Sequence, residues 1–342
     1  MQPCPGSRRL ARTSRCWRVG LALVLGFGLA DAASAANPPP AGSDADVAHA
    51  PANPANVIAV LVPEVAEPYR SVFAKIIEGA ESATHARVTT FQVGASVDPV
   101  ELGARLRGAG AKVVIALGRN GLKATEGLDS RLAVVVGGVM LMSETARADT
   151  LMGINLSPDP ALLFTRLKVL QPAVRRVLVV YDPKYNDWLI RLARDAAKAQ
   201  SLELVAYEAR DLPAAAKAYE ALFANATEHR DAVWLPQDPT SVEESTLVPL
   251  VLKESWNRHL VVFSSSYVHV RKGALFVLYP DNFELGRDLA MAALKLLAGE
   301  PRGGMRPLRE VLTGVNLRSA SHLGLKLDPE QLRGFDSVFQ EQ

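Results

Sequence analysis

The chain has 342 residues, of which 49% are hydrophobic and 22% are charged, and its formal net charge is +2. This length exceeds what one hydrophobic core usually organises, so we expect two domains. A net charge so close to zero gives no support to the binding of nucleic acid or another polyanion. Aromatic residues make up only 6% of the chain, and the aliphatic content suits sheets covered by helices.

Residues 1–35 have the pattern of a secretory signal peptide. Five arginines and no acidic residue precede an almost wholly apolar stretch at 19–30, and Ala33-Ser34-Ala35 follows it. The apolar stretch is about a dozen residues long, shorter than the ~20 that a membrane-spanning helix needs. We therefore expect cleavage near Ala35 and export to the periplasm.

The mature chain is expected to lack thiols. Cys4 and Cys16 both lie within the predicted signal, which leaves no disulfide and no thiolate metal site and favours a soluble periplasmic form over a lipid-anchored one. Cleavage would change the 38 basic and 36 acidic residues to 33 and 35, a net charge of −2. Residues 36–56 are rich in proline and small residues, and we predict a flexible leader there.

The remaining chain repeats one pattern twice, in which a short aliphatic run is followed by a polar or Gly/Pro break and an amphipathic stretch. Near-continuous aliphatic runs are typical of strands buried on both faces of a parallel sheet. The first set predicts strands at 57–62, 87–93, 112–117 and 133–139, with helices from about 68, at 98–107 and from about 120. The second set predicts strands at 176–181, 203–207, 232–235 and 260–263, with helices at 188–200, 212–225 and 242–256. The predicted fold class is therefore α/β, with two Rossmann-like lobes and parallel sheets.

Segments that cross between the lobes are predicted to form a multi-strand hinge. Residues 151–156 indicate one crossing, and Asp159-Pro160 would cap a helix through 170. The strongly apolar helix at 283–298 is predicted to return to the first lobe, and the tail from 307 to cross back. These segments assign 57–153 and 281–305 to lobe 1, and 154–280 and 306–342 to lobe 2.

Candidate ligand-binding residues follow the predicted strands. In open parallel α/β sheets, ligands bind beyond the carboxyl ends of the strands, where loops and helix N-termini meet. In the first lobe the residues at these positions are Glu64, Tyr69, Gly118, Arg119, Asn120 and Gly138. In the second lobe they are Asp182, Tyr185, Asn186, Gln237, Asp238, Ser264, Ser266 and Tyr267, with Asp281 at the predicted hinge.

Each of these candidates also has a purely structural explanation. Arg119 offers a planar fork suited to a carboxylate or phosphate, but a solvated arginine at a helix start is equally consistent with the pattern. Asp182 and Asp238 end two strands of one sheet and would attract an ammonium group, whereas Asp-Pro pairs are also common in turns and caps. Tyr185 and Tyr267 suit stacking on a flat ligand.

The sequence shows no catalytic or metal-binding pattern. Its six histidines include no pair at the i, i+4 spacing of a helical zinc site, and each, including His269, is better explained as a surface or capping residue. Ser264-Ser265-Ser266 lacks the Gly-x-Ser-x-Gly elbow of hydrolases. We therefore expect no catalytic residue, no metal and no cofactor, and an enzyme is the least favoured of three hypotheses.

Several short motifs occur in a fixed order along the chain. They are Gln171-Pro172, Leu235-Pro236-Gln237-Asp238, Leu260-Val261-Val262-Phe263-Ser264, Leu285-Gly286-Arg287, Leu297-Ala298-Gly299-Glu300-Pro301 and Val315-Asn316-Leu317. Through them, the chain from about 57 to 329 resembles the ABC-transporter substrate-binding proteins that include the tryptophan/tyrosine-type binders, a branch of the type I periplasmic binding proteins. The resemblance implies two lobes, a three-stranded hinge, a ligand enclosed between the lobes and no catalysis. It marks Tyr181-Asp182, Tyr185-Asn186, Gln237-Asp238 and the 264–267 loop as second-lobe contacts.

The first lobe departs from the family's pattern. Many members place a threonine at the helix start after the third strand, where this chain has Leu117-Gly118-Arg119-Asn120. The predicted ligand is therefore a small polar molecule, an amino acid or a related compound. The leading hypothesis is a monomeric periplasmic receptor that delivers this ligand to an inner-membrane ABC permease. The alternative is a ligand sensor that partners a membrane kinase or an outer-membrane uptake receptor, and the sequence does not separate the two.

Overall fold

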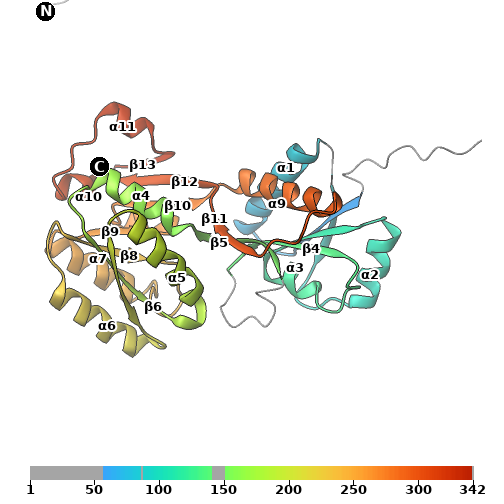
Figure 1. Cartoon of the computed structure of the whole chain (residues 1–342), viewed down its shortest axis with the longest axis horizontal. Coiled ribbons are helices and arrows are strands. Elements are labelled where there is room, and N and C mark those ends of the chain that lie inside the picture. Colours follow the sequence, from blue (N-terminus) through green and yellow to red (C-terminus); the bar gives the residue numbers. More distant parts are fainter. Residues whose placement is uncertain (1–56, 86–87, 141–150, 341–342) are drawn as a thin grey trace, which may run out of the picture. The chain divides into compact units, whose positions relative to one another are not determined.

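The computed structural model describes residues 57–85, 88–140 and 151–340, so the predicted signal peptide and leader lie outside the described residues. Two sheets organise the described chain (Figure 1). Lobe 1, as the term is used from here on, is the six-stranded sheet with its helices, and lobe 2 is the seven-stranded sheet with its helices. No helix within the described ranges is long and apolar enough to cross a membrane.

Lobe 1 is built on a six-stranded parallel sheet. Its strands are β1 (Ile58–Pro63), β2 (Thr89–Val93), β3 (Val113–Leu117), β4 (Ala133–Val139), β5 (Met152–Pro158) and β11 (Met305–Leu308), in the order β11-β5-β4-β3-β1-β2. Its helices are α1 (Tyr69–Thr84), α2 (Pro99–Gly108), α3 (Gly118–Ala124) and α9 (Asn282–Leu297). Each paired strand is parallel to its neighbour. The strands predicted from aliphatic runs are therefore confirmed as one sheet.

Alternate residues of the lobe 1 strands enter two cores. Ile58 and Val60 of β1 pack with α1 and α9, whereas Ala59 and Leu61 pack with α2. All four side chains are almost fully buried, and burial of a large aliphatic side chain contributes roughly 1.5–3 kcal/mol. Both faces of the sheet are thus apolar, which explains why the sequence shows a continuous hydrophobic run rather than alternation.

The predicted return of the apolar C-terminal helix to lobe 1 is confirmed. Helix α9 lies beside α1 on one face of the six-stranded sheet (Figure 1). The two backbones approach closely at two glycines: a Cβ added to Gly286 would overlap the carbonyl oxygen of Ile76, and one added to Gly79 would overlap that of Phe283. Only glycine permits this approach, so these two residues fix how the helices pack.

Lobe 2 is built on a seven-stranded sheet. Its strands are β6 (Arg176–Tyr181), β7 (Glu203–Glu208), β8 (Asp231–Leu235), β9 (Val261–Ser264), β10 (Phe276–Pro280), β12 (Val311–Asn316) and β13 (Ser337–Phe339), in the order β13-β12-β10-β9-β8-β6-β7. Its helices are α4 (Pro160–Leu170), α5 (Pro183–Ala199), α6 (Leu212–Asn225), α7 (Leu247–Asn257), α8 (Tyr267–Lys272), α10 (Leu317–His322) and α11 (Pro329–Arg333). Only β10 and β12 pair antiparallel among the strands of the described chain.

The lobe 2 sheet separates two helical layers in the same way. Val177 and Val179 of β6 pack with α4 and α5, and Leu178 and Val180 pack with α6 and α7. Trp234 of β8 is fully buried and meets the ring of Phe164 edge to face at 5.7 Å. The strands thus present a rigid platform whose carboxyl ends carry the predicted site residues.

Three crossings connect the lobes and are hydrogen-bonded to one another. The amide of Asp159 donates to the carbonyl of Leu308 at 2.8 Å, and the amide of Asp281 donates to the carbonyl of Glu310 at 3.0 Å. Arg309 also pairs with the Asp159 carboxylate at 2.8 Å. Because β5 lies wholly in the six-stranded sheet, that sheet runs through Pro158, past the boundary predicted at 153.

Two helices begin elsewhere than the sequence predicts. Helix α5 begins at Pro183 rather than 188, because the Asp182 side chain accepts the Lys184 amide and caps it. Helix α7 begins at Leu247 rather than 242, because the Glu243 carboxylate accepts the amides of Ser245 and Thr246 and holds a turn. The hydrogen bond from the Ser245 hydroxyl, together with these amide bonds, lowers the Glu243 pKa to about 2.

Candidate functional site

The carboxyl edge of lobe 2, where the parallel strands end, is organised around two buried aspartates. The Asp238 carboxylate accepts four hydrogen bonds: from the amides of Thr240 and Ser241 at 2.9 Å each, from the Asp182 amide at 2.7 Å and from the Asn186 side chain at 2.9 Å. Two carboxylate oxygens have about four lone-pair sites, so these bonds use them all. Asp238 therefore joins the loops after β6 and β8.

Asp182 has a similar positioning role. One carboxylate oxygen accepts the Lys184 amide at 2.9 Å, and the other accepts the Thr240 hydroxyl at 2.9 Å. Its side chain is only 4% exposed, as is that of Asp238. The two carboxylates do share one edge of the sheet, as predicted, but they bind protein groups within it.

The side chain of Gln237 has one buried polar atom without a hydrogen-bond partner. Its Nε2 donates to the Ser265 carbonyl at 3.0 Å, while its Oε1 is buried and has no hydrogen-bond partner. Asn186, 1% exposed, donates to the Gln237 carbonyl at 3.1 Å and holds the backbone of this residue. A buried acceptor without a donor costs about 1–3 kcal/mol, so a donor that reached this oxygen would stabilise the edge.

Of the three consecutive serines at the end of β9, Ser264 and Ser265 are buried and Ser266 is partly exposed. Ser264 is fully buried and donates to the Leu235 carbonyl at 3.1 Å. Ser266, at the N-cap of α8, is partly exposed, and none of the side-chain hydrogen bonds of the described chain involves its hydroxyl. Of the two predicted contacts, Ser266 is the one with a hydroxyl available to another molecule.

His269 is not the surface or capping residue that the sequence predicts. It is 1% exposed, its Nδ1 lies 2.6 Å from the Ser264 hydroxyl and its Nε2 lies 2.8 Å from the Glu244 carboxylate. Burial lowers the His269 pKa, although Glu244 acts in the opposite direction. The serine in this Ser-His-Glu series is inaccessible, so the series links the β9 loop to Glu244 and Lys272 as an internal hydrogen-bond chain.

The two predicted aromatic residues of lobe 2 stand on separate helices. Tyr185 is half-buried in the first turn of α5, with the Lys184 ammonium 5.8 Å from its ring. Tyr267 begins α8, is 38% exposed and packs against Tyr279 and Phe339 at 4.7 and 5.5 Å. Both rings lie beyond strand ends, but Tyr267 is held by the C-terminal strand β13.

At the carboxyl edge of lobe 1, two predicted glycines surround an aromatic ring. Gly118 and Gly138 have φ of 68° and 67°, which disfavours other residues. An added Cβ would lie 3.1 Å from the Phe73 ring at Gly118 and 3.2 Å from it at Gly138. The half-buried Phe73 of α1 was not among the predicted site residues, because its helical spacing indicated only core packing. It places an aromatic surface in the centre of this edge.

The polar candidates of lobe 1 are more exposed. Glu64 and Arg119 are exposed and form no ion pair within the described residues, and Tyr69 is 65% exposed at the start of α1. Asn120 lines a cavity of about 160 Å³ between α3 and the loop after β2. None of the described contacts joins these four side chains to one another. Asp281 caps α9 by accepting the amides of Phe283 and Glu284, so its visible role is to begin that helix on a crossing segment.

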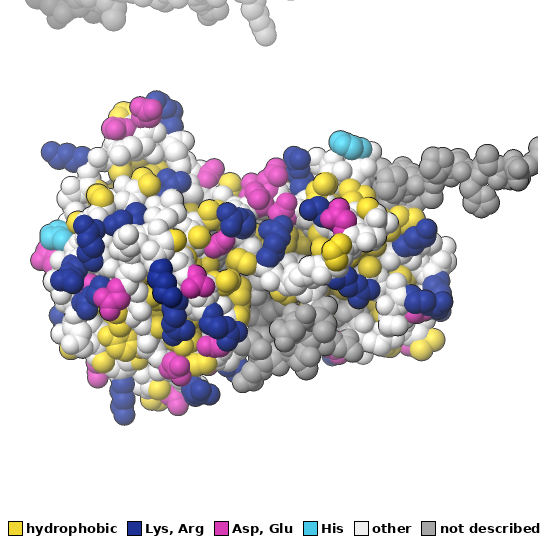
Figure 2. Space-filling view, in the orientation of Figure 1, with side chains coloured by type: hydrophobic (Ala, Val, Ile, Leu, Met, Phe, Trp, Pro, Cys, Tyr) yellow, Lys and Arg dark blue, Asp and Glu magenta, His cyan; other side chains and the backbone are white. Residues whose placement is uncertain are grey.

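Charges of both signs are interspersed over the face that carries α4 and α5 (Figure 2). This mixture agrees with the near-neutral net charge. Among the described residues, no group of three or more His, Cys, Asp or Glu side chains is arranged to hold a metal ion.

Two α/β lobes with hydrogen-bonded crossings and polar strand ends define the class of type I periplasmic binding proteins. A family model described as ABC transporter substrate binding protein matches residues 137–334. The match covers more than half of the chain, and the chain therefore belongs to this family of substrate-binding proteins, which bind small molecules and serve ABC permeases.

Solved structures share the fold at low sequence identity. A Streptococcus pneumonia ABC domain in complex with L-Trp has 16% identity and a TM-score of 0.52, covering 82% of this chain and 99% of its own. A ligand-free, open substrate binding protein with adhesive properties from Clostridium difficile has 15% identity and a TM-score of 0.57, covering 83% and 99%. A conserved domain protein from Vibrio cholerae has 16% identity and a TM-score of 0.51, covering 83% and 100%. No curated protein matches the chain.

Proposed function

We propose that the chain is an exported receptor that encloses an amino acid or a related small polar molecule between its two lobes and delivers it to an inner-membrane ABC permease. Binding would occur without turnover. The family match supports the transport role, and the signal-peptide pattern at 1–35 supports export.

The single observation that carries the ligand class is the buried, unpartnered Oε1 of Gln237. An ammonium or amide group of the ligand would donate to this oxygen and remove its desolvation cost. The Ser266 hydroxyl would add a second polar contact, and Tyr185 and Tyr267 would supply apolar walls. The pneumococcal protein of the same fold, which was solved with L-Trp, is consistent with this class.

Lobe 1 would complete the site with different chemistry. Arg119 is exposed at the start of α3, where its guanidinium is free to hold a carboxylate, and Phe73 offers a ring beside it in the same edge. An α-amino acid carries both the ammonium and the carboxylate that these two edges favour. In this proposal Asp182 and Asp238 position the loops, and the crossings at Asp159, Asp281 and Glu310 act as the hinge.

Isothermal titration of the chain against the twenty L-amino acids, with purines and neutral sugars as separate arms, tests the ligand class. We expect saturable binding of one or a few amino acids, and a smaller radius of gyration in solution scattering when the ligand is present. Binding of a sugar alone would overturn the amino-acid assignment. Failure of every arm to bind would count against a receptor of this kind.

A further inference from the structure

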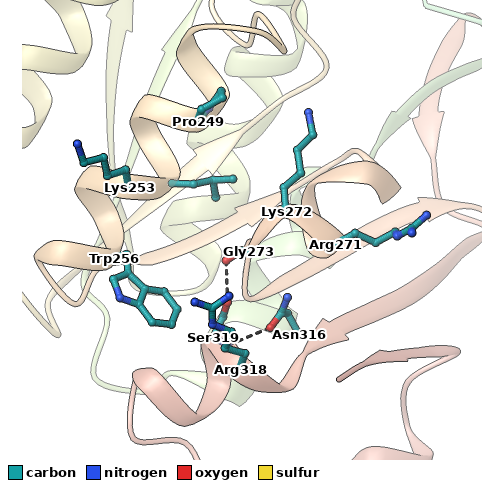
Figure 3. Close-up of a pocket in the computed structure, with 10 residues that line it drawn as sticks. Pro249, Lys253, Trp256, Arg271, Lys272, Gly273, Asn316, Arg318 and Ser319 are labelled. Atoms are coloured by element: carbon teal, nitrogen blue, oxygen red, sulfur yellow. Dashed lines mark hydrogen bonds between the residues drawn. The ribbon is translucent and has the colours of Figure 1, made fainter. Parts of the chain in front are cut away.

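A hollow distinct from the proposed ligand site lies at the opposite, amino-terminal edge of the lobe 2 sheet. It has a volume of about 450 Å³ and is bounded by α7, the last turn of α8 with Gly273, the end of β12 and α10 (Figure 3). Gly273 precedes β10, and Asn316 ends the antiparallel β12, so both mark the edge at which the parallel strands begin. The pocket therefore lies at the opposite end of the strands from Gln237, which follows the carboxyl end of β8.

The pocket is strongly basic. Lys253, Arg271, Lys272 and Arg318 line it, and no acidic residue does. Lys272 forms an ion pair at 2.6 Å with Glu244, which does not itself line the pocket. Lys253 and Arg271 are exposed and form no ion pair or hydrogen bond with another described residue. Lys253 and Arg271 thus flank the hollow without a protein partner, and their charged ends point to opposite sides of it (Figure 3).

An aromatic ring lies beside these charges. The indole of Trp256 stacks on the His322 imidazole, with centroids 3.6 Å apart and planes 7° apart. The Arg318 guanidinium lies 5.1 Å from the centre of the same indole, and both side chains are drawn in Figure 3. His322 Nε2 also bonds the Trp256 carbonyl at 2.9 Å. The ring is therefore fixed in place and offers an apolar surface next to positive charge.

A buried hydroxyl next to the pocket lacks a partner. Ser255 is 1% exposed, and its Oγ has no hydrogen bond. It lines a cavity of about 20 Å³ that shares Leu252, Trp256, Gly273 and Ser319 with the basic pocket. A space of this size admits one water or one ligand atom. An unpaired buried hydroxyl costs about 1–3 kcal/mol, which such an occupant would offset.

We propose that this pocket binds a small organic anion whose body lies near Trp256, and that the long exposed side chains of Lys253 and Arg271 turn inward from its two sides to neutralise the negative charge. The volume falls within the range of small-molecule sites, roughly 300–1,000 Å³, and the concave shape favours a small ligand over an extended acidic peptide. The Ser255 hydroxyl would bond the ligand directly or through one water. This second site shares no residue with the proposed amino-acid site.

Titration with inorganic phosphate, citrate and benzoate at low ionic strength, followed by tryptophan fluorescence and calorimetry, tests the proposal. The three probes separate phosphate, tricarboxylate and aromatic carboxylate chemistry. We expect at least one to bind saturably, and the Lys253→Ala/Arg271→Ala variant to bind it about tenfold or more weakly, with a melting temperature unchanged from the parent. Added salt should weaken binding to the parent protein.

The matched control removes the same two charge types from the exposed surface of lobe 2 elsewhere, as Arg210→Ala/Lys217→Ala, and should retain the parent affinity. Equal loss in both variants would indicate a general charge effect and overturn the site. No binding of any probe at millimolar concentration, or binding only of a glutamate-rich peptide, would overturn it too. Amino-acid binding should survive in the Lys253→Ala/Arg271→Ala variant, so the failure of either proposal is recognised separately.

Discussion

The carboxyl edges of the two lobes use different chemistry on the same scaffold. In lobe 2 the strand ends are tied by side-chain hydrogen bonds among Asp182, Asn186, Gln237 and Asp238. In lobe 1 the corresponding loops close on the Phe73 ring through two glycines of positive φ. The family match begins at residue 137 and so leaves out β1 to β3. The family match therefore covers most of lobe 2, which carries the polar network, and only part of lobe 1.

This contrast predicts that the largest effect on stability arises in the lobe 2 network. Asp238→Ala leaves four donors without an acceptor, and we expect the free energy of unfolding to fall by about 3 kcal/mol or more. Urea denaturation measures this. Asp211→Ala, which removes the single cap of α6, is the matched control and should cost about 1 kcal/mol. Equal losses of unfolding free energy in the two variants would mean that the Asp238 network stabilises the protein no more than a single helix cap does.

A glycine of the lobe 1 edge should affect stability without affecting ligand affinity. Gly118→Ala forces a side chain into positive φ and toward Phe73 and Pro63, and we expect a loss of about 1–2 kcal/mol. Gly303→Ala, where nothing lies within 4 Å of an added Cβ, is the control and should be near neutral. If ligand affinity falls more than stability at Gly118, the glycine serves close approach of the ligand instead.

Gln237 should show the opposite behaviour. Gln237→Leu removes the unpartnered oxygen and also the hydrogen bond from Nε2 to the Ser265 carbonyl. These two changes act on stability in opposite directions, so we expect amino-acid affinity to fall about tenfold while the free energy of unfolding changes little. Calorimetric titration and urea denaturation of the same preparation separate the two quantities. Arg119→Ala, on the other lobe, should lower the affinity only for ligands that carry a carboxylate. Unchanged affinity in Gln237→Leu would contradict the ligand class that we propose.

The smallest expected effect is a pH dependence that originates in lobe 2. Burial lowers the His269 pKa from its ordinary 6.5, so the unfolded chain binds this proton more readily than the folded one. Stability should therefore decline as pH falls below about 6.5 toward the lower folded pKa, an effect that His269→Gln should reduce. Thermal melting between about pH 7 and pH 5, roughly the range in which histidine titrates, measures this slope. An identical slope in the variant would assign the effect to other groups.

Local patterns predicted the elements, and local side-chain caps account for the two helix starts that were predicted wrongly. The strands at 133–139 and 176–181 and the helix at 212–225 have the predicted bounds, because aliphatic runs and capping residues act within a few residues of the sequence. The starts of α5 and α7 were wrong by five residues each, since side-chain caps at Asp182 and Glu243 decide them.

The candidate site was predictable in position but only partly in role. Strand ends located Gln237 and Ser266 correctly as edge residues, because parallel topology fixes where loops gather. Whether an aspartate is saturated by protein donors, as Asp238 is, depends on residues more than fifty positions away. The burial of His269 and the exposure of the Phe73 ring have the same origin. No local signal distinguishes them from ordinary helix residues.

The three crossings determine when either lobe can be finished during synthesis. Lobe 1 takes α9 and β11 from residues after Asp281, and lobe 2 takes β12 and β13 from residues after Glu310. A nascent polypeptide released only as far as Pro280 therefore contains two incomplete sheets, each with an edge still unpaired. Cooperative folding of both lobes therefore has to wait for the final thirty or so residues of the chain.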